Sequence, residues 1–168
     1  MSKKIVNRVA NSKLVNIDLE DFYPEGERVL FDIKDWLFAE QILKEKDFRV
    51  SVENHNWRSY QNKFVALTCS ADAIIPSWAY LLITIELSPF AEKIVVGNLE
   101  MLESSIFQKI IEQLSIENYV DKPVIIKGCT NKPIPDTAYS QLISKLFPVA
   151  RSIMYGEACS NVPLFRKK

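Results

Sequence analysis

Hydrophobic residues along the chain follow two patterns, and each predicts a different kind of strand. Residues 14–19 alternate apolar and polar side chains, a period of two that is typical of a half-buried strand. Residues 28–33 predict a second short strand, which we expect to pair with the first as an antiparallel edge. Continuous apolar runs are instead expected of strands buried on both faces of a parallel sheet. Four such runs occur, at residues 64–67, 94–96, 124–126 and 153–155.

Helices are predicted between the continuous apolar runs. Two of them follow Pro76 and Pro135, and we expect Ser77 and Asp136 to be their N-caps, because these side chains accept hydrogen bonds from free backbone N–H groups. A third helix is predicted over residues 99–114, where apolar residues recur at spacings of three and four. Strands and helices therefore alternate through this part of the chain, which calls for a parallel sheet with right-handed crossovers.

The N-terminal third has a weaker pattern. We expect helices from Lys34 onward and over residues 47–60, next to the two short strands. A chain of 168 residues is long enough to bury a single core. The predicted fold is therefore a single α/β domain over residues 1–168, with a mainly parallel sheet and flanking helices. Residues 1–62 would be an N-terminal strand and helix elaboration of that domain.

One segment of the chain occurs twice, 59 residues apart. Residues 75–97 and 134–156 are identical at nine of 23 paired positions without a gap. Two similar helix environments are the alternative explanation, but the fixed 13-residue separation of two prolines favours a duplication. We therefore expect residues 63–168 to form pseudo-symmetric βαβ halves of one sheet. The identical pairs are Ile75/Ile134, Pro76/Pro135, Ala79/Ala138, Tyr80/Tyr139, Leu87/Leu146, Pro89/Pro148, Ala91/Ala150, Ile94/Ile153 and Gly97/Gly156.

Composition and charge narrow the class of protein. The chain is 48% hydrophobic and 25% charged, which is ordinary for a soluble globular protein. Its 21 basic and 21 acidic residues cancel, so we expect neither nucleic acid nor an anionic membrane as a partner. No apolar stretch of the kind found in signal peptides follows the first residues, and the longest apolar run, residues 78–85, is too short to span a bilayer. The expected location is the cytoplasm.

The three cysteines follow predicted strands at the point where each strand ends. Cys69, Cys129 and Cys159 stand shortly after the runs that end at residues 67, 126 and 155. Ligands of open α/β sheets bind outside the carboxyl ends of the strands, so we expect the three sulfurs at that edge. The pattern Cys-Ser/Thr-Asn-x-Pro also occurs at both Cys129 and Cys159, as expected of similar exposed turns.

Metal binding would account for this placement. Three thiolates would bind zinc or part of an iron–sulfur cluster, with the fourth position open or filled by Asp72, Glu157, His55 or an outside ligand. The absence of a Cys-x-x-Cys pair from the sequence argues against a metal site.

Thiol chemistry and simple burial of the cysteines stay open as alternatives. Cys129 or Cys69 would be the nucleophile of a cysteine-dependent transferase or a thiol redox enzyme, and Lys127 and Lys132 would stabilise a thiolate at Cys129 or bind an anion. Alternatively, the cysteines are small buried residues of a non-catalytic interaction protein. No phosphate-binding glycine loop, dinucleotide fingerprint, nucleophile elbow or His-Glu-x-x-His motif occurs.

Five short sequences carry a resemblance to a known family. They are VNRVANS at residues 6–12, IDLEDFYP at 17–24, ALTCSADA at 66–73, IIKGC at 125–129 and YGEACS at 155–160. Together they resemble a small bacterial family with a domain of unknown function, over nearly the whole chain. The resemblance brings no catalytic residues. It associates the chain with gene neighbourhoods for iron–sulfur cluster assembly, and so implies sulfur, iron or thiol chemistry and a protein partner in that assembly. A homodimer is a further expectation.

Overall fold

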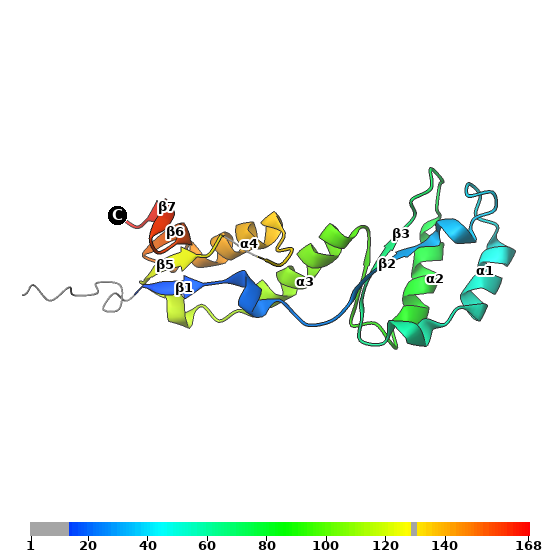
Figure 1. Cartoon of the computed structure of the whole chain (residues 1–168), viewed down its shortest axis with the longest axis horizontal. Coiled ribbons are helices and arrows are strands. Elements are labelled where there is room, and N and C mark those ends of the chain that lie inside the picture. The colour runs from blue at the N-terminus through cyan, green and yellow to red at the C-terminus, as the bar shows by residue number, and fades with distance from the viewer. Residues whose placement is uncertain (1–13, 129–130) are drawn as a thin grey trace, which may run out of the picture. The chain divides into compact units, whose positions relative to one another are not determined.

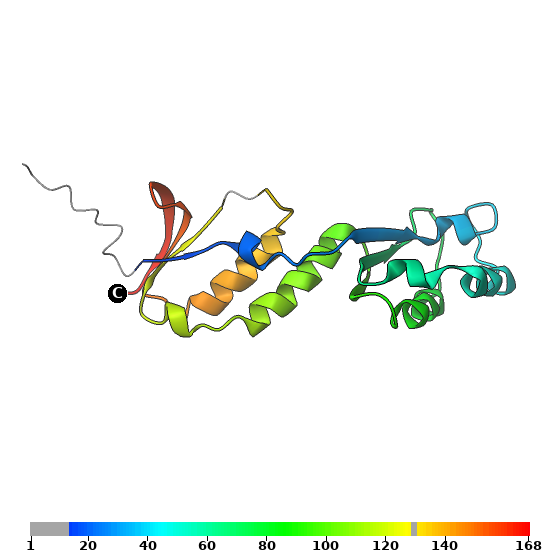
Figure 2. The same cartoon turned by 60° about the horizontal axis from the view of Figure 1, so that its bottom comes forward.

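The computed structural model describes residues 14–128 and 131–168, which form a mixed α/β structure with mostly parallel strands (Figures 1 and 2). The chain divides into two compact units, each with its own sheet. Unit 1 combines the N-terminal residues through Tyr23 with Phe107–Lys168, and unit 2 is Pro24–Ile106. Across the two described stretches, no helix has the length and apolar character needed to cross a membrane.

Unit 1 is built on a sheet with the strand order β1-β5-β6-β7. The first three strands are parallel, and β7 returns antiparallel to β6 as a hairpin. A 3₁₀ turn (η1) follows β1, and α4 connects β5 to β6 as the crossover of a parallel pair. The bounds are β1 Val15–Ile17, η1 Leu19–Phe22, α3 Leu99–Gln113, β5 Pro123–Ile126, α4 Asp136–Leu146, β6 Ser152–Glu157 and β7 Ser160–Arg166. The first residues of α3, through Ile106, belong to unit 2.

The core of unit 1 lies between one face of this sheet and two helices. Alternation along β1, β5 and β6 turns every second side chain toward this core. α4 and the second half of α3 lie along that face of the sheet (Figure 2). These core residues include Ile17, Val124, Ile126 and Ile153 from the strands, and Phe107, Ile111, Leu142 and Leu146 from the helices. The register pairs Asn16, Ile125, Met154 and Pro163 in one row across the four strands, which alternation assigns to the other face.

Unit 2 has a three-stranded parallel sheet with the order β2-β3-β4. Its core joins the sheet to α1 and α2 and contains several aromatic side chains. Every residue from Phe64 to Leu67 in the central strand is buried, so the prediction of a strand covered on both faces is confirmed. The bounds are β2 Arg28–Asp32, η2 Ile33–Trp36, α1 Glu45–Asn54, η3 Trp57–Tyr60, β3 Phe64–Thr68, α2 Ser77–Leu87 and β4 Lys93–Val96.

The predicted pairing of the first two strands is wrong. The strand at residues 15–17 pairs in parallel with β5, while the strand at residues 28–32 pairs in parallel with β3 in the other sheet. The two strands are neighbours in sequence but belong to different sheets, because each pairs with a different buried strand. The apolar strands likewise form two sheets rather than the single sheet expected.

The similar segments 75–97 and 134–156 occupy the same place in their units. Each supplies the helix and last strand of a parallel strand–helix–strand unit, β3-α2-β4 or β5-α4-β6. The equivalent glycines Gly97 and Gly156 both have positive φ, of 148° and 122°. The duplication itself stays a prediction.

Several helix predictions need correction. The segment after Lys34 is a short 3₁₀ turn followed by an irregular loop, because Ala39 and Glu40 adopt positive φ values that end any regular helix. The helix predicted over 47–60 divides into α1 and η3 at His55, where the backbone is extended. Ser77 and Asp136 are the first helical residues rather than N-caps, since Pro76 and Pro135 occupy the cap positions.

Candidate functional site

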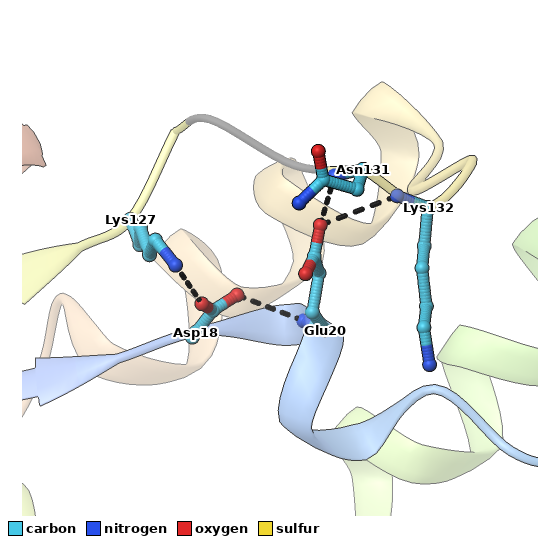
Figure 3. A network of polar contacts seen from close by, with 5 residues as sticks. All are labelled: Asp18, Glu20, Lys127, Asn131 and Lys132. Atoms are coloured by element: carbon cyan, nitrogen blue, oxygen red, sulfur yellow. Dashed lines mark hydrogen bonds and ion pairs between the residues drawn. The ribbon is translucent and has the colours of Figure 1, made fainter.

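The carboxyl ends of β1 and β5 are joined by an ion pair in unit 1. Lys127, directly after β5, places its Nζ atom 2.7 Å from Oδ2 of Asp18, directly after β1 (Figure 3). The backbone N–H of Lys127 also donates to the carbonyl of Ile17, which extends the pairing of the two strands by one bond. The Asp18 side chain is 16% exposed and the Lys127 side chain 41%. The sheet itself therefore brings these two side chains together at its edge.

Asp18 has a second role as the cap of the 3₁₀ turn. Its Oδ1 atom accepts a 2.9 Å hydrogen bond from the backbone N–H of Glu20. Both carboxylate oxygens of Asp18 are thus used, one by the turn and one by Lys127, and this fixes the orientation of the carboxylate.

Neighbouring carboxylates stabilise the protonated form of Lys127. The hydrogen bond to Asp18 and the charge of that carboxylate, together with the charges of Glu157 and Glu20, outweigh desolvation and raise the pKa of Lys127 above its usual 10.5. Lys127 is therefore an ammonium group at neutral pH, suited to binding an acceptor and unsuited to acting as a neutral-amine base or nucleophile.

A small cavity lies at this edge of the sheet, beside the ion pair. Its volume is about 260 Å³, and its lining includes both Lys127 and Glu157, the last residue of β6. Gly156 in this lining has φ of 122°, and a Cβ atom there would lie 2.6 Å from the carbonyl oxygen of Ser160, so the hairpin needs glycine. The cavity is lined by Asn16, Ile17, Asp18, Ile125, Lys127, Gly156, Glu157 and Ala158.

Glu20 forms hydrogen bonds with the loop that follows β5. Its Oε1 atom accepts hydrogen bonds from the backbone N–H groups of Asn131 and Lys132, the latter at 3.2 Å (Figure 3). The ammonium of Lys132 lies 4.9 Å from the centre of the Tyr23 ring, within the range of a cation–π contact. The 3₁₀ turn after β1 thus holds the far end of the loop, as Asp18 holds its start.

Sequence reasoning selected Lys127 and Glu157 but missed Asp18 and Glu20. The available signal was the motif Asp18-Leu19-Glu20 at the end of the strand predicted over residues 14–19, because an aspartate at the end of a strand commonly caps a turn. The signal does not identify the partner, which lies 109 residues away in the chain.

The cysteines are placed in different surroundings. Cys159 is exposed in the two-residue turn between β6 and β7, next to Ala158 of the cavity lining. Cys69 belongs to unit 2, where it is half-buried and its Sγ atom lies 3.9 Å from the carbonyl oxygen of Ala71. The predicted nucleophile and ligand Cys129 lies outside the described residues.

The predicted metal ligands that the structure describes do not form a cluster. Within residues 14–128 and 131–168, no three His, Cys, Asp or Glu side chains are grouped so that they could hold a metal ion. Of the expected fourth ligands, Asp72 and Glu157 are exposed, while His55 lies among aromatic rings with Nε2 3.1 Å from Oη of Tyr60. His55 is therefore placed as a structural residue, and its burial lowers its pKa below 6.5.

The carboxyl edge of unit 2 repeats part of this arrangement. Asp32 is the last residue of β2, caps the turn that begins at Ile33, and accepts 3.0 Å hydrogen bonds from the backbone N–H groups of Lys34 and Ser70. Burial opposes ionisation of Asp32, but the bonds from Ser70 and Lys34 and the charge of Lys34 outweigh it and lower the pKa. Burial, with smaller effects of the nearby Cys69 and Asp32, raises the pKa of Tyr80. In both units, an aspartate at the carboxyl end of the first strand bonds to the segment that follows the second strand.

Comparison with known proteins places the chain in a family. A family model described as protein of unknown function (DUF2480) matches residues 3–167. The chain belongs to the DUF2480 family. The match spans both units, so the ion pair of unit 1 and the Asp32 cluster of unit 2 both lie within the DUF2480 region. No curated protein and no solved structure matches this DUF2480 chain. The association with iron–sulfur cluster assembly stays a prediction.

Proposed function

We propose that this DUF2480 protein binds a small zwitterionic ligand of the amino-acid class in the cavity at the carboxyl ends of β1, β5 and β6. The observation that carries the proposal is that a lysine and a glutamate, Lys127 and Glu157, both line one cavity of about 260 Å³. Ligands of parallel α/β sheets bind at this edge, which supports the location.

The charges of the cavity favour a zwitterion over a simple ion. Asp18 accepts one of the three hydrogens of the Lys127 ammonium, and the others suit a ligand carboxylate. Glu157 is an acceptor for a ligand ammonium. A simple anion would meet the repulsion of Asp18 and Glu157, and a simple cation would meet that of Lys127.

The size of the cavity limits the ligand. Pockets for drug-sized molecules have volumes of about 300–1,000 Å³. A cavity of about 260 Å³ suits a ligand with few heavy atoms. Because Lys127 stays charged at neutral pH, its role is to bind and orient the ligand.

Calorimetric titration with glycine, acetate and methylammonium tests the proposal. We expect glycine to bind more tightly than either single-charge probe, and Lys127→Gln to weaken glycine binding by about tenfold or more, since charge-assisted hydrogen bonds are the strong ones. Lys63→Gln is the matched control, because Lys63 also forms a 2.7 Å ion pair, with Glu27 in unit 2, and lines none of this cavity. Tighter binding of acetate, or equal effects of the two variants, would contradict the proposal.

Metal or iron–sulfur binding by the cysteines is the second candidate function. It is favoured by the position of Cys159 in the turn beside the cavity, with Cys129 two residues after Lys127 in the sequence. Elemental analysis and an ultraviolet–visible spectrum of anaerobically purified protein test it, and a metal-free protein would refute it.

A further inference from the structure

A second cavity lies in unit 1, toward the start of β5 and β6, and the proposed function does not use it. Its volume is about 680 Å³, and its lining residues come from the first residues of β5 and β6, from β7 and from the residues that follow β7. The lining residues are Pro123, Arg151, Ser152, Met154, Pro163, Phe165, Arg166 and Lys167.

The charge of this cavity has one sign. Arg151, Arg166 and Lys167 line it, and no carboxylate does so among the described residues. Within the described ranges, none of the three cations forms an ion pair. Like charges gathered around one cavity repel each other and raise the local concentration of anions, so an anion with two charges is the ligand that this arrangement favours.

The remaining lining is mostly apolar. Met154, Pro163 and Phe165 contribute apolar surface, and a bulge in the pairing of β6 with β7, between Ile153 and Met154, brings Pro163 opposite Met154. Bulges of this kind redirect side chains at the edges of sheets. A ligand that fits both parts of the lining has a dianionic group and an apolar or aromatic body.

Backbone hydrogen bonds fix the main chain of two of the cationic residues. The N–H of Arg151 donates to the carbonyl of Lys122, and the N–H of Lys167 donates to the carbonyl of Arg151, at 2.9 and 2.8 Å. Two of the three cationic residues are thus fixed to each other by a main-chain bond that does not depend on their side chains. The cavity is therefore part of the folded sheet.

We infer that this cavity binds a phosphomonoester with an aromatic or apolar body, such as a mononucleotide. Guanidinium groups bind phosphate oxygens through paired hydrogen bonds, and Arg151 and Arg166 supply two of them. The Ser152 hydroxyl is an additional donor in the lining. The site is separate from the cavity of Lys127, with which it shares no lining residue.

Calorimetric titration with adenosine monophosphate, adenosine and inorganic phosphate tests the inference. We expect adenosine monophosphate to bind most tightly and its affinity to fall as the salt concentration rises. The double variant Arg151→Gln/Arg166→Gln should lose about tenfold in affinity for each cation removed. The control, Arg58→Gln/Lys109→Gln, removes the same charge from exposed positions outside the cavity and should bind as the wild type does.

Amide chemical shifts provide a readout that needs no variant. Adenosine monophosphate should shift the amides of Ser152, Met154, Phe165 and Lys167 in the wild-type chain and leave the amides of Gly156 and Glu157, in the other cavity, unchanged. Equal losses of affinity in the cavity variant and the control would show that adenosine monophosphate binds through general surface charge. That result would overturn the inference. Absence of binding at millimolar concentration would overturn it as well.

Discussion

Asp18 and Lys127 lie 109 residues apart in the chain, and their side chains meet at 2.7 Å where β1 and β5 end. The parallel pairing of these strands aligns Ile17 with Ile126, so the next residue of each strand emerges at the same edge. The ion pair is therefore a consequence of sheet register. It places an ammonium group that is charged at neutral pH beside a cavity.

The stability contributed by Lys127 should depend on pH at the alkaline end. Its pKa is raised in the folded protein, so the contribution is fully present below the unfolded value of about 10.5 and is lost as pH rises through the folded value. We expect the difference in unfolding free energy between wild type and Lys127→Met to be constant from pH 7 to about 10 and to shrink above it. Urea unfolding at each pH measures it. A difference that grows with pH would contradict the assignment.

Breaking the buried ion pair of unit 2 should lower the free energy of unfolding more than breaking an exposed ion pair. Nε of Arg28 lies 2.7 Å from Oε1 of Glu103, and the two side chains are only 13% and 7% exposed. Glu103→Ala should lower the free energy of unfolding by about 3 kcal/mol, because it leaves the buried Arg28 charge without its main partner.

The exposed ion pair of α1 is the control for that prediction. Arg49 and Glu45 are 2.9 Å apart but 52% and 63% exposed. Glu45→Ala should change the free energy of unfolding by less than about 0.5 kcal/mol. Urea denaturation of both variants measures the contrast, and equal costs would show that the Arg28–Glu103 pair is not specially stabilised by its burial.

Protonation of His55 should destabilise the protein in mild acid. Burial among Phe31, Trp36, Trp57 and Tyr60 lowers the pKa of His55 below 6.5. The unfolded chain then takes up the proton first, so stability is retained above pH 6.5 and falls as pH drops through the lowered value. The fall in unfolding free energy between pH 7 and 5 should be smaller in His55→Gln than in wild type. Identical pH profiles would refute this role.

The two described cysteines should react with thiol reagents at different rates. Cys159 is exposed in a turn and Cys69 is half-buried, so alkylation of the folded chain should modify Cys159 first. Mass spectrometry of the digested protein after short exposure to iodoacetamide gives the order. Faster modification of Cys69 would indicate an activated thiol in the Asp32 and Tyr80 surroundings and would favour the thiol-enzyme hypothesis.

The strands and helices could be predicted from the sequence where burial alone decides them. The run Phe64–Leu67 is apolar because it is covered on both faces, and α3 has its period because one side packs on a core. The partner of each strand could not be predicted, because pairing depends on non-local contacts. Residues 15–17 and 28–32 are both short strands with mixed apolar and polar residues, but they join different sheets.

The same limit explains which residues of the candidate site could not be predicted. The carboxyl edge of the sheet was predicted as the place of a site, with Lys127 as a residue flanking Cys129 and Glu157 as an alternative metal ligand. Asp18 and Glu20 were missed because their partners lie after β5. The three cysteines were expected at one sheet edge, but Cys69 and Cys159 belong to different units.

Side-chain nuclear magnetic resonance of Lys127 tests the central claim most directly. In protein labelled with ¹⁵N-lysine, glycine should shift the Nζ signal of Lys127, and in uniformly labelled protein it should shift the amides of Gly156 and Glu157. The Lys63 signal should stay constant, because Lys63 lies outside the cavity lining. If glycine shifts neither the Lys127 signal nor these amides, or shifts Lys63 equally, the cavity at the carboxyl ends of β1, β5 and β6 is not the zwitterion site.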